Sequence, residues 1–280
     1  MDEVCFSTGT FSHDFSLSAR IEFLIEQGIR SVELSGGNHE KEWRTVLSRF
    51  PEVIFSFHNY FPPPEVPFVF NLASSNSEIR DASINLCKEG ILLSSEFGQR
   101  HFSFHAGFLF DPTPSSLGSE LESSSLMLSP ESANSNFSKS IDEIAGFAAR
   151  YKVAPLVENN VLTLGTASKW GSNSLLLANA NEIEEFSRFW GPNVGVLVDV
   201  GHLNVSSRTL ELDFDLELER CITLASALHL HSNNGKEDEH LGISGKESWW
   251  KRINARRDIP WTFEVKPNEV SITLESLGLK

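Results

Sequence analysis

Short runs of apolar residues recur along the chain, and six of them end in His, Asp or Glu. The runs are rich in β-branched and aromatic residues, which is typical of buried strands. Parallel α/β folds carry their chemistry at the carboxyl ends of such strands. The pattern therefore predicts a ring of ligand residues around a shared centre. The residues that end the runs are His58, His105, Glu158, Asp199, His229 and Glu264.

The apolar runs alternate with segments of helical periodicity. We predict strands over residues 4–7, 31–34, 53–58, 102–105, 154–158, 194–199, 227–231 and 261–264. We predict helices over residues 17–27, 41–50, 77–98, 137–151, 181–189, 214–221, 247–254 and 271–277. This alternation is the signature of parallel βα units. Because the glycine fingerprint of a dinucleotide-binding sheet is absent, the sequence predicts an α/β protein with a single (β/α)8 TIM barrel of parallel strands, formed by residues 1–280 as one domain.

Two connections between the predicted elements are unusually long. Residues 59–76 are rich in proline, and residues 111–136 are rich in serine and are predicted to lack regular structure. Both connections follow the carboxyl end of a strand, so they would lie over the active face of a barrel. The serine-rich connection is either a solvated surface insertion or a lid over that face.

The composition is that of a globular protein, with 40% hydrophobic and 22% charged residues. The length of 280 residues is a little above the roughly 250 that are typical of one such barrel. No apolar run approaches the roughly 20 residues that a membrane helix needs. The N-terminus lacks the basic and then apolar pattern of a signal peptide. We therefore expect a cytoplasmic protein with no membrane partner.

The chain is strongly acidic. It has 23 Lys and Arg against 38 Asp and Glu, which gives a formal net charge of −15. Such a surface repels the phosphates of nucleic acids, so we do not expect DNA as a partner. A small anionic substrate is still compatible with this charge, because bound cations dominate the field inside a pocket.

Four of the strand-end residues are of the types that bind divalent metals. Barrel geometry places Glu158, Asp199, His229 and Glu264 on one face, at the ends of the last four strands. Carboxylates combined with a neutral imidazole suit Mn, Mg, Co, Fe or Zn. The alternative is a set of capping or hydrogen-bonded polar residues, which is disfavoured because carboxylates clustered without a metal repel one another.

The order of the candidate residues resembles that of the xylose isomerase-like TIM-barrel superfamily. This superfamily includes sugar and sugar-phosphate isomerases and epimerases, and also DNA-repair enzymes of the endonuclease IV type. The resemblance covers nearly the whole chain. The residues that carry it are His58, His105, Glu158, Asp199-Val200-Gly201-His202, His229, Asp238-Glu239-His240 and Glu264.

Resemblance to the epimerases implies one divalent metal held by Glu158, Asp199, His229 and Glu264. The two glutamates, Glu158 and Glu264, would form the catalytic acid–base pair that removes and returns a proton beside a metal-polarised carbonyl. His202 would contact the substrate, a small carbohydrate or sugar phosphate. The stretch 159–166 lacks the second glutamate that some ketose epimerases carry there.

Resemblance to endonuclease IV implies three zinc ions. The matching ligands are His58, His105 and Glu158 for one ion, Glu158, Asp199, His229 and Glu264 for the second, and His202, Asp238 and His240 for the third. Two metals about 3.5–4 Å apart stabilise the attacking and leaving oxygens of a phosphodiester. The acidic charge weighs against DNA as the substrate of such an enzyme.

Further residues are candidates for binding substrate, and each has an ordinary structural alternative. His231 points the same way as His229 on a strand, and otherwise is a hydrogen-bonded neighbour of the ligands. Asn59 and Asn159 would orient hydroxyl groups or cap loops. Lys266 would bind a phosphate or pair with a ligand carboxylate. Glu33 would hydrogen-bond substrate or lie at the pocket rim.

We therefore consider three functions. The leading hypothesis is a sugar or sugar-phosphate isomerase or epimerase that works by carboxylate-mediated proton transfer. The second is an endonuclease IV-like phosphodiesterase, acting on abasic DNA or on a small phosphorylated substrate. The third is a metal-binding barrel without catalytic activity. The number of bound ions, from one to three, separates the first two hypotheses, and the sequence leaves the oligomeric state open.

Overall fold

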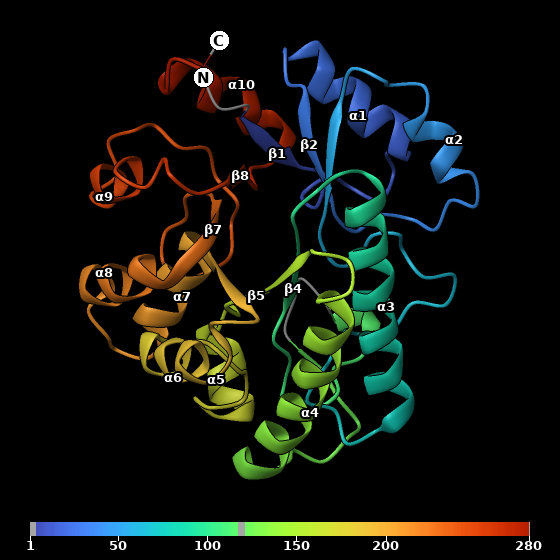
Figure 1. Cartoon of the computed structure of the whole chain (residues 1–280). Helices are drawn as coiled ribbons and strands as arrows, with labels where there is room; N and C mark the ends of the chain where they lie inside the picture. The colour runs from blue at the N-terminus through green and yellow to red at the C-terminus, as the bar shows by residue number, and fades with distance from the viewer. Residues whose placement is uncertain (1–3, 117–120, 280) are drawn as a thin grey trace.

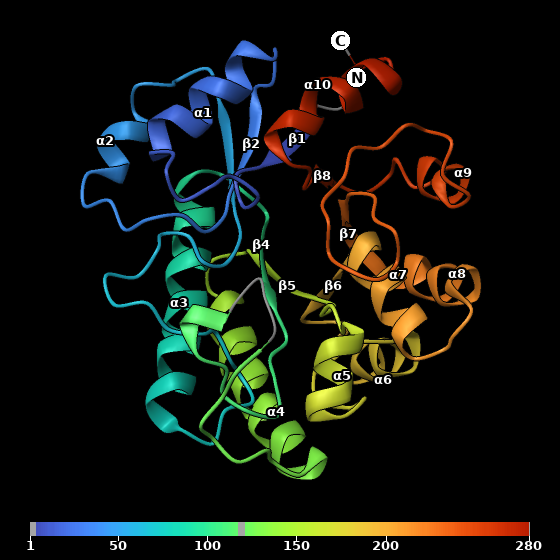
Figure 2. The same ribbon diagram turned by 180° about the vertical axis from the view of Figure 1, so that it is seen from behind.

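The computed structural model describes residues 4–116 and 121–279. In this part of the chain, eight strands occupy the centre of the molecule and helices surround them (Figures 1 and 2). The strands are β1 (Cys5–Ser7), β2 (Ser31–Leu34), β3 (Ile54–Phe57), β4 (His101–His105), β5 (Ala154–Glu158), β6 (Gly195–Asp199), β7 (Ala225–Leu230) and β8 (Trp261–Phe263).

The helices fill the connections between successive strands. They are α1 (Leu17–Glu26), α2 (Trp43–Leu47), α3 (Ser77–Glu96), α4 (Pro130–Ala148), α5 (Leu164–Trp170), α6 (Ala180–Trp190), α7 (Val200–Thr209), α8 (Phe214–Leu224), α9 (Trp250–Asn254) and α10 (Pro267–Ser276), with a short 3-10 turn, η1 (Pro114–Ser116). Among the described residues, none of these helices has the length and apolar character needed to cross a membrane.

The strands form a nearly closed barrel. Their order is β3-β2-β1-β8-β7-β6-β5-β4, and each neighbouring pair is parallel. The edge strands β3 and β4 are joined by an isolated parallel bridge between His58, directly after β3, and Ser103 in the middle of β4. The Nδ1 atom of His58 also lies 2.9 Å from the Ser103 hydroxyl. The prediction of a single (β/α)8 barrel with parallel strands is confirmed, whereas the assignment of all 280 residues to one domain stays a prediction.

The alternation of side chains along the strands directs the candidate ligands into the barrel. Leu156, Leu197 and Ala227 form a small buried cluster apart from the main core, which packs between strands and helices. Residues two apart on a strand share a face. Glu158 and Asp199 therefore continue the interior layer that Leu156 and Leu197 begin.

Two helices were not predicted from the sequence, α5 and α7. Helix α7 begins at Val200, directly after β6, and Asp199 caps it by accepting a hydrogen bond from the backbone N–H of His202 at 2.6 Å. An Asp at the N-cap is a strong helix-start signal. From the sequence, Asp199 is predicted only to end a strand, whereas in the structure it ends β6 and also caps α7.

The prediction that residues 111–136 lack regular structure is wrong for the last part of this segment. Helix α4 begins at Pro130, and the Ser129 side chain caps it by accepting a hydrogen bond from the N–H of Ser132. Serine followed by proline at the first helical position is a helix start, but the high serine content hid it. Residues 117–120 of this candidate lid lie outside the described residues.

Gly90 of α3 lies directly against the ring of Phe102 in β4, and a Cβ added at Gly90 would lie 2.1 Å from that ring. We expect Gly90→Ala to lower the free energy of unfolding by about 1–3 kcal/mol, because the added methyl overpacks the core. Gly146→Ala in α4 is the matched control, since a Cβ there meets nothing within 4 Å. The control should raise stability by roughly 0.5–1 kcal/mol. Denaturant unfolding measures both variants, and equal effects would contradict the packing argument.

Candidate metal centre

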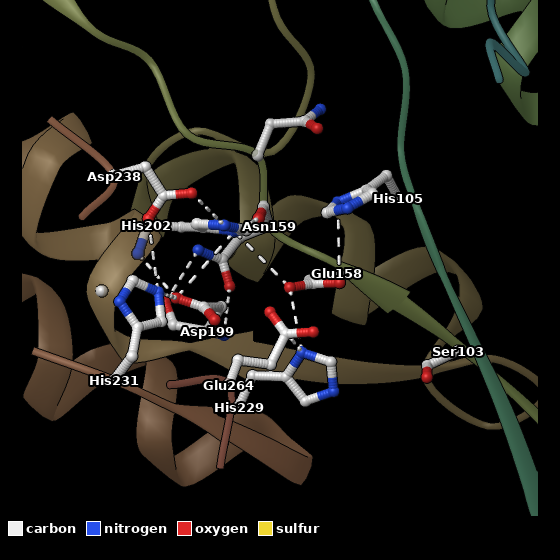
Figure 3. A network of polar contacts seen from close by, with 12 residues as sticks. Ser103, His105, Glu158, Asn159, Asp199, His202, His229, His231, Asp238 and Glu264 are labelled. Carbon is white, nitrogen blue, oxygen red and sulfur yellow. Dashed lines mark hydrogen bonds and ion pairs between the residues drawn. The ribbon is translucent and has the colours of Figure 1, made fainter. Parts of the chain in front are cut away.

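The carboxyl ends of the strands bring the predicted ligands together inside one end of the barrel (Figure 3). Three groups of these residues have ligand atoms that lie within 4.8 Å of one another inside each group. The groups are His58, His105 and Glu158; Glu158, Asp199, His229 and Glu264; and His231, Asp238 and His240. His202 joins the third cluster, with its Nε2 atom 3.3 Å from Asp238. We call these the first cluster (His58, His105 and Glu158), the second cluster (Glu158, Asp199, His229 and Glu264) and the third cluster (His202, His231, Asp238 and His240).

Glu158 belongs to the first and second clusters and uses a different oxygen for each. Its Oε2 atom lies 3.2 Å from Nε2 of His58 and 3.6 Å from Nδ1 of His105. Its Oε1 atom lies 3.3 Å from Nδ1 of His229 and 3.5 Å from Nδ1 of His202. Figure 3 shows Glu158 lying between His105 and the residues of the second cluster. A carboxylate placed in this way could hold one ion with each oxygen.

The ring nitrogens of His58 and His229 that face away from Glu158 are held by neighbouring side chains. The Ser103 hydroxyl contacts Nδ1 of His58 at 2.9 Å, and Oε2 of Glu33 lies 3.2 Å from Nε2 of His229. Partners of this kind fix the orientation of a metal-binding imidazole and raise its basicity. The two rings are therefore positioned before any ion arrives.

Many polar atoms of the clusters, and one of the neighbouring Glu33, are buried without a hydrogen-bond partner. They are Oε1 of Glu33, Nδ1 of His105, both carboxylate oxygens of Glu158, Oδ2 of Asp199, Nδ1 of His229, Nε2 of His231 and Oδ1 of Asp238. A buried polar group without a partner is costly. Divalent metal ions would satisfy these atoms, and the mixture of imidazole and carboxylate donors is one that binds such ions.

The pKa values of Glu158 and Glu264 are both shifted downward, in favour of the ionised carboxylate. Burial by itself raises the pKa of Glu158, but the imidazoles of His105, His229 and His58 outweigh it and hold the pKa below its ordinary value. Burial likewise opposes ionisation of Glu264, and His229 overcomes it, so that the pKa lies well below its ordinary value. These side chains are therefore in the form that binds metal at neutral pH.

The pKa values of two imidazoles of the clusters, His105 and His240, are shifted in opposite directions. Burial lowers the pKa of His105 to about 4, even though Glu158 is nearby, so this ring is neutral at pH 7. Burial also disfavours the charged form of His240, but its hydrogen bond to Asp238 and the charge of that residue outweigh burial and raise its pKa to about 9. A metal ion that binds His240 must displace this proton.

Comparison with known proteins places the chain in a family. A family model described as a xylose isomerase-like TIM barrel matches residues 21–273, far more than half of the chain. The chain belongs to the xylose isomerase-like TIM-barrel family. Among curated proteins, the probable endonuclease 4 of Aquifex aeolicus (strain VF5) is 24% identical over 233 residues, which cover 75% of this chain and 74% of that protein.

Solved structures share the fold of this xylose isomerase-like barrel over almost its whole length. A D-tagatose 3-epimerase-like protein is 19% identical with a TM-score of 0.68, and the match covers 99% of this chain and 97% of that one. A Thermus thermophilus protein soaked with ZnCl2 is 18% identical with a TM-score of 0.66 and 99% coverage of both chains. A putative xylose isomerase from Rhodospirillum rubrum is 13% identical with a TM-score of 0.70, covering 99% and 98%.

The predicted substrate-binding asparagines of this xylose isomerase-like barrel contact the backbone. Oδ1 of Asn59 accepts a hydrogen bond from the N–H of His105 at 2.9 Å. Oδ1 of Asn159 accepts from the N–H of Asp199 at 2.8 Å, and its Nδ2 donates to the carbonyl of Asp199 at 3.1 Å. Lys266 is exposed and precedes α10, outside the three clusters. Roles of these residues in substrate binding stay predictions.

Two contacts around the clusters were not predicted from the sequence, those of Ser103 with His58 and of Glu33 with His229. Ser103 was not a candidate, although it is two residues before His105 and therefore lies on the same face of β4. Glu33 was predicted to hydrogen-bond substrate or to lie at the pocket rim. His231 was predicted to contact substrate or to be a hydrogen-bonded neighbour of the ligands. The structure places Glu33 against the ring of His229 and His231 in the third cluster. The contact between Glu33 and His229 joins residues 196 positions apart, so no local pattern reveals it.

We expect Glu33→Gln to weaken metal binding about 10- to 100-fold, because the variant loses the negative charge that supports the His229 ring. The matched control is Glu52→Gln, since Glu52 is exposed. Competition with a chromophoric chelator measures the affinity of both variants and of the wild-type protein. Equal affinities for Glu33→Gln and the control would show that Glu33 does not support a metal ligand.

Proposed function

We propose that this chain is a metal-dependent phosphodiesterase that acts on a small phosphorylated substrate. The observation that carries the proposal is Glu158, whose two oxygens face different clusters. This contact favours the phosphodiesterase over the isomerase or epimerase that the sequence alone ranks first. Proton transfer at a single metal needs only the second cluster. It would leave the buried His58 of the first cluster without a role in the reaction.

The residues present fit closely spaced divalent ions. Glu158 would hold two of them, with His58 and His105 on one side and Asp199, His229 and Glu264 on the other. Such ions supply an activated water and neutralise the charge that develops on the attacking and leaving oxygens of a phosphoester. The ligand side chains would hold the ions in place, and their carboxylates would supply negative charge beside the cations.

The side of the centre that is open to solvent is marked by the few cluster residues whose side chains are partly exposed. The side chain of His105 is 31% exposed, and those of Asp238 and His240 are each 22% exposed, whereas Glu158 and His229 are buried. A phosphate would approach on this side. The net charge of −15 opposes a long polyanion such as DNA, but a small substrate feels mainly the field of the bound cations.

An epimerase is the second candidate, because Glu158 and Glu264 both contact His229 in the second cluster. Oε1 of Glu158 and Oε2 of Glu264 lie 3.3 and 3.6 Å from its Nδ1 atom. Two buried carboxylates beside one metal position are the groups that proton abstraction and return would need. In this alternative, a single ion in the second cluster would be sufficient.

The test combines metal content with activity. Protein loaded with zinc should hold three ions per chain, one for each cluster, and should hydrolyse bis(p-nitrophenyl) phosphate in a chelator-sensitive reaction. It should show little activity on abasic DNA at physiological salt. One ion, together with exchange of ketose protons for deuterium from the solvent, would overturn the proposal in favour of an epimerase. Bound ions without activity in either assay would instead favour a non-catalytic metal-binding barrel.

A further inference from the structure

His231 lies immediately after β7 and is fully buried, with 0% exposure. It is two residues beyond His229, so its side chain lies on the same face of the strand. Its Nε2 atom lies 3.1 Å from Oδ1 of Asp199 and 3.4 Å from Oδ1 of Asp238, and it has no hydrogen-bond partner. A fully buried imidazole nitrogen between two carboxylates therefore needs a chemical explanation.

The three imidazoles of the third cluster point the same nitrogen at Asp238. Their Nε2 atoms lie 3.3 Å (His202), 3.4 Å (His231) and 3.1 Å (His240) from its carboxylate oxygens. Figure 3 shows His202 and His231 beside Asp238. Asp238 is thus the centre on which three potential nitrogen ligands converge.

The other nitrogen of each ring faces a backbone carbonyl. Nδ1 of His202 lies 3.0 Å from the carbonyl oxygen of Asn159. Nδ1 of His231 lies 3.4 Å from that of Ser232, and Nδ1 of His240 lies 2.8 Å from that of Glu264. A carbonyl only accepts hydrogen bonds, so it favours the tautomer with the proton on Nδ1. The Nε2 atoms of all three rings face Asp238, and they are then the nitrogens that would bind a metal ion once it displaces any proton they carry.

We propose that His231 is a fourth protein ligand of the third cluster, which makes this cluster a closed zinc site of three imidazoles and one carboxylate. Resemblance to endonuclease IV implies only His202, Asp238 and His240 at this position. The inference rests on the proposal that the clusters bind metal ions, but it is independent of the reaction they catalyse. Three imidazoles and one carboxylate make the four-ligand set that is typical of structural zinc sites, and no position would be left open for water at this cluster.

The surroundings of His231 are shaped to hold its ring. A Cβ added at Gly201 would lie 2.0 Å from Cε1 of His231, so the ring can occupy its place only because residue 201 is a glycine. Asn233 ties the following loop to α7, since its Nδ2 donates to the carbonyl of Gly201 at 2.9 Å. The glycine of the Asp199-Val200-Gly201-His202 motif therefore makes room for the proposed ligand.

The loop that carries the remaining ligands returns to His231. Ser232 and Leu241 form a two-way backbone pair, with N–H to carbonyl distances of 2.9 and 2.8 Å. This pair closes the loop that brings Asp238 and His240 beside the ring. A zinc ion in the third cluster would fasten this loop to the barrel, and hydrolysis would take place at the first and second clusters.

A rival role for His231 is to donate a hydrogen bond from Nε2 to Asp199, which lies 3.1 Å away. In that case the ring would position a ligand of the second cluster and would not bind metal. The two roles differ in which ion is lost when the imidazole is removed. Metal binding without any assay of activity can therefore distinguish them.

The test measures zinc bound to full-length His231→Asn at a buffered free zinc concentration, with exposed His13→Asn as the matched control. We expect the wild-type protein and the control to hold three ions. The dissociation constant of one ion should rise by more than about 100-fold in His231→Asn, because loss of a direct ligand should cost more than loss of a supporting partner. Gly201→Ala, which displaces the ring, should give the same loss. Circular dichroism verifies that each variant folds.

Cobalt titration of the wild-type protein tests the inference without any substitution. A closed four-coordinate site should give a third equivalent with intense visible absorption, and a weakly absorbing third ion would overturn the inference. Three ions of unchanged affinity in His231→Asn, or loss of the ion of the second cluster, would overturn it while leaving the proposed function intact. A wild-type chain that binds fewer than three ions would contradict both the inference and the proposed function. Failure of the proposed function alone would be seen as loaded protein without phosphodiesterase activity.

Discussion

Glu158→Gln should lower kcat for phosphodiester hydrolysis by about 1,000-fold or more, which corresponds to about 4 kcal/mol of transition-state stabilisation. Glu158 faces the first cluster with one oxygen and the second cluster with the other, and it is 1% exposed. An amide in its place has one oxygen, no charge and an NH2 group that cannot bind a cation. The variant should therefore lose tight binding at two neighbouring positions.

Glu264→Gln is the informative comparison for Glu158→Gln. Glu264 belongs to the second cluster only, so its variant should lose one ion and keep those of the first and third clusters. Elemental analysis of both variants, together with kcat, measures the difference. If each variant lost a single ion, or if Glu158→Gln kept all ions and more than a tenth of the wild-type activity, Glu158 would not bridge two metals.

The carboxyl-end ligands could be predicted from the sequence because two simple rules act together. A buried parallel strand is an apolar run, and its last residue reaches the pocket at the end of the barrel. Side chains two residues apart share a face, which places Glu158 above Leu156 and Asp199 above Leu197. These rules depend only on local pattern, so the second cluster follows from one sequence.

The contacts that complete the site depend on strand neighbours and on loops. Glu33 reaches His229 because β1 and β8 lie between β2 and β7 in the barrel and bring their interior faces together. The place of His231 in the third cluster depends on a loop that returns Asp238 and His240 to it. The alternation of side chains along a strand does not indicate which distant strand or loop a residue will contact. The start of α7 at Val200 was missed for a different reason, since one residue, Asp199, both ends a strand and caps a helix.

Removing the metal ions should lower the melting temperature by roughly 8 °C or more. An ion present at 1,000 times its dissociation constant stabilises the folded state by about 4 kcal/mol, and each kcal/mol shifts the melting temperature of a chain of this size by about 2–4 °C. In the stripped protein, the buried carboxylates of Glu158, Asp199 and Glu264 lie together with only the neighbouring imidazoles to offset their charge.

Differential scanning calorimetry with and without a chelator measures this shift, and adding zinc back should reverse it. The control is Glu158→Gln, in which the shift should be clearly smaller because two ion positions are weakened. An identical melting temperature for stripped and loaded wild-type protein would mean that the clusters do not bind metal tightly.

The difference between loaded and stripped protein should also grow as the pH rises. In the stripped protein, Asp238 raises the pKa of His240 to about 9, above the 6.5 of an unperturbed histidine. A raised pKa in the folded state contributes stability that is fully present below about pH 6.5 and is lost as the pH rises through about 9. Zinc binds the deprotonated ring, so the loaded protein gains affinity over the same interval. Melting temperatures measured from pH 6 to pH 9 should therefore diverge, and parallel curves would show that His240 does not exchange a proton for a metal ion.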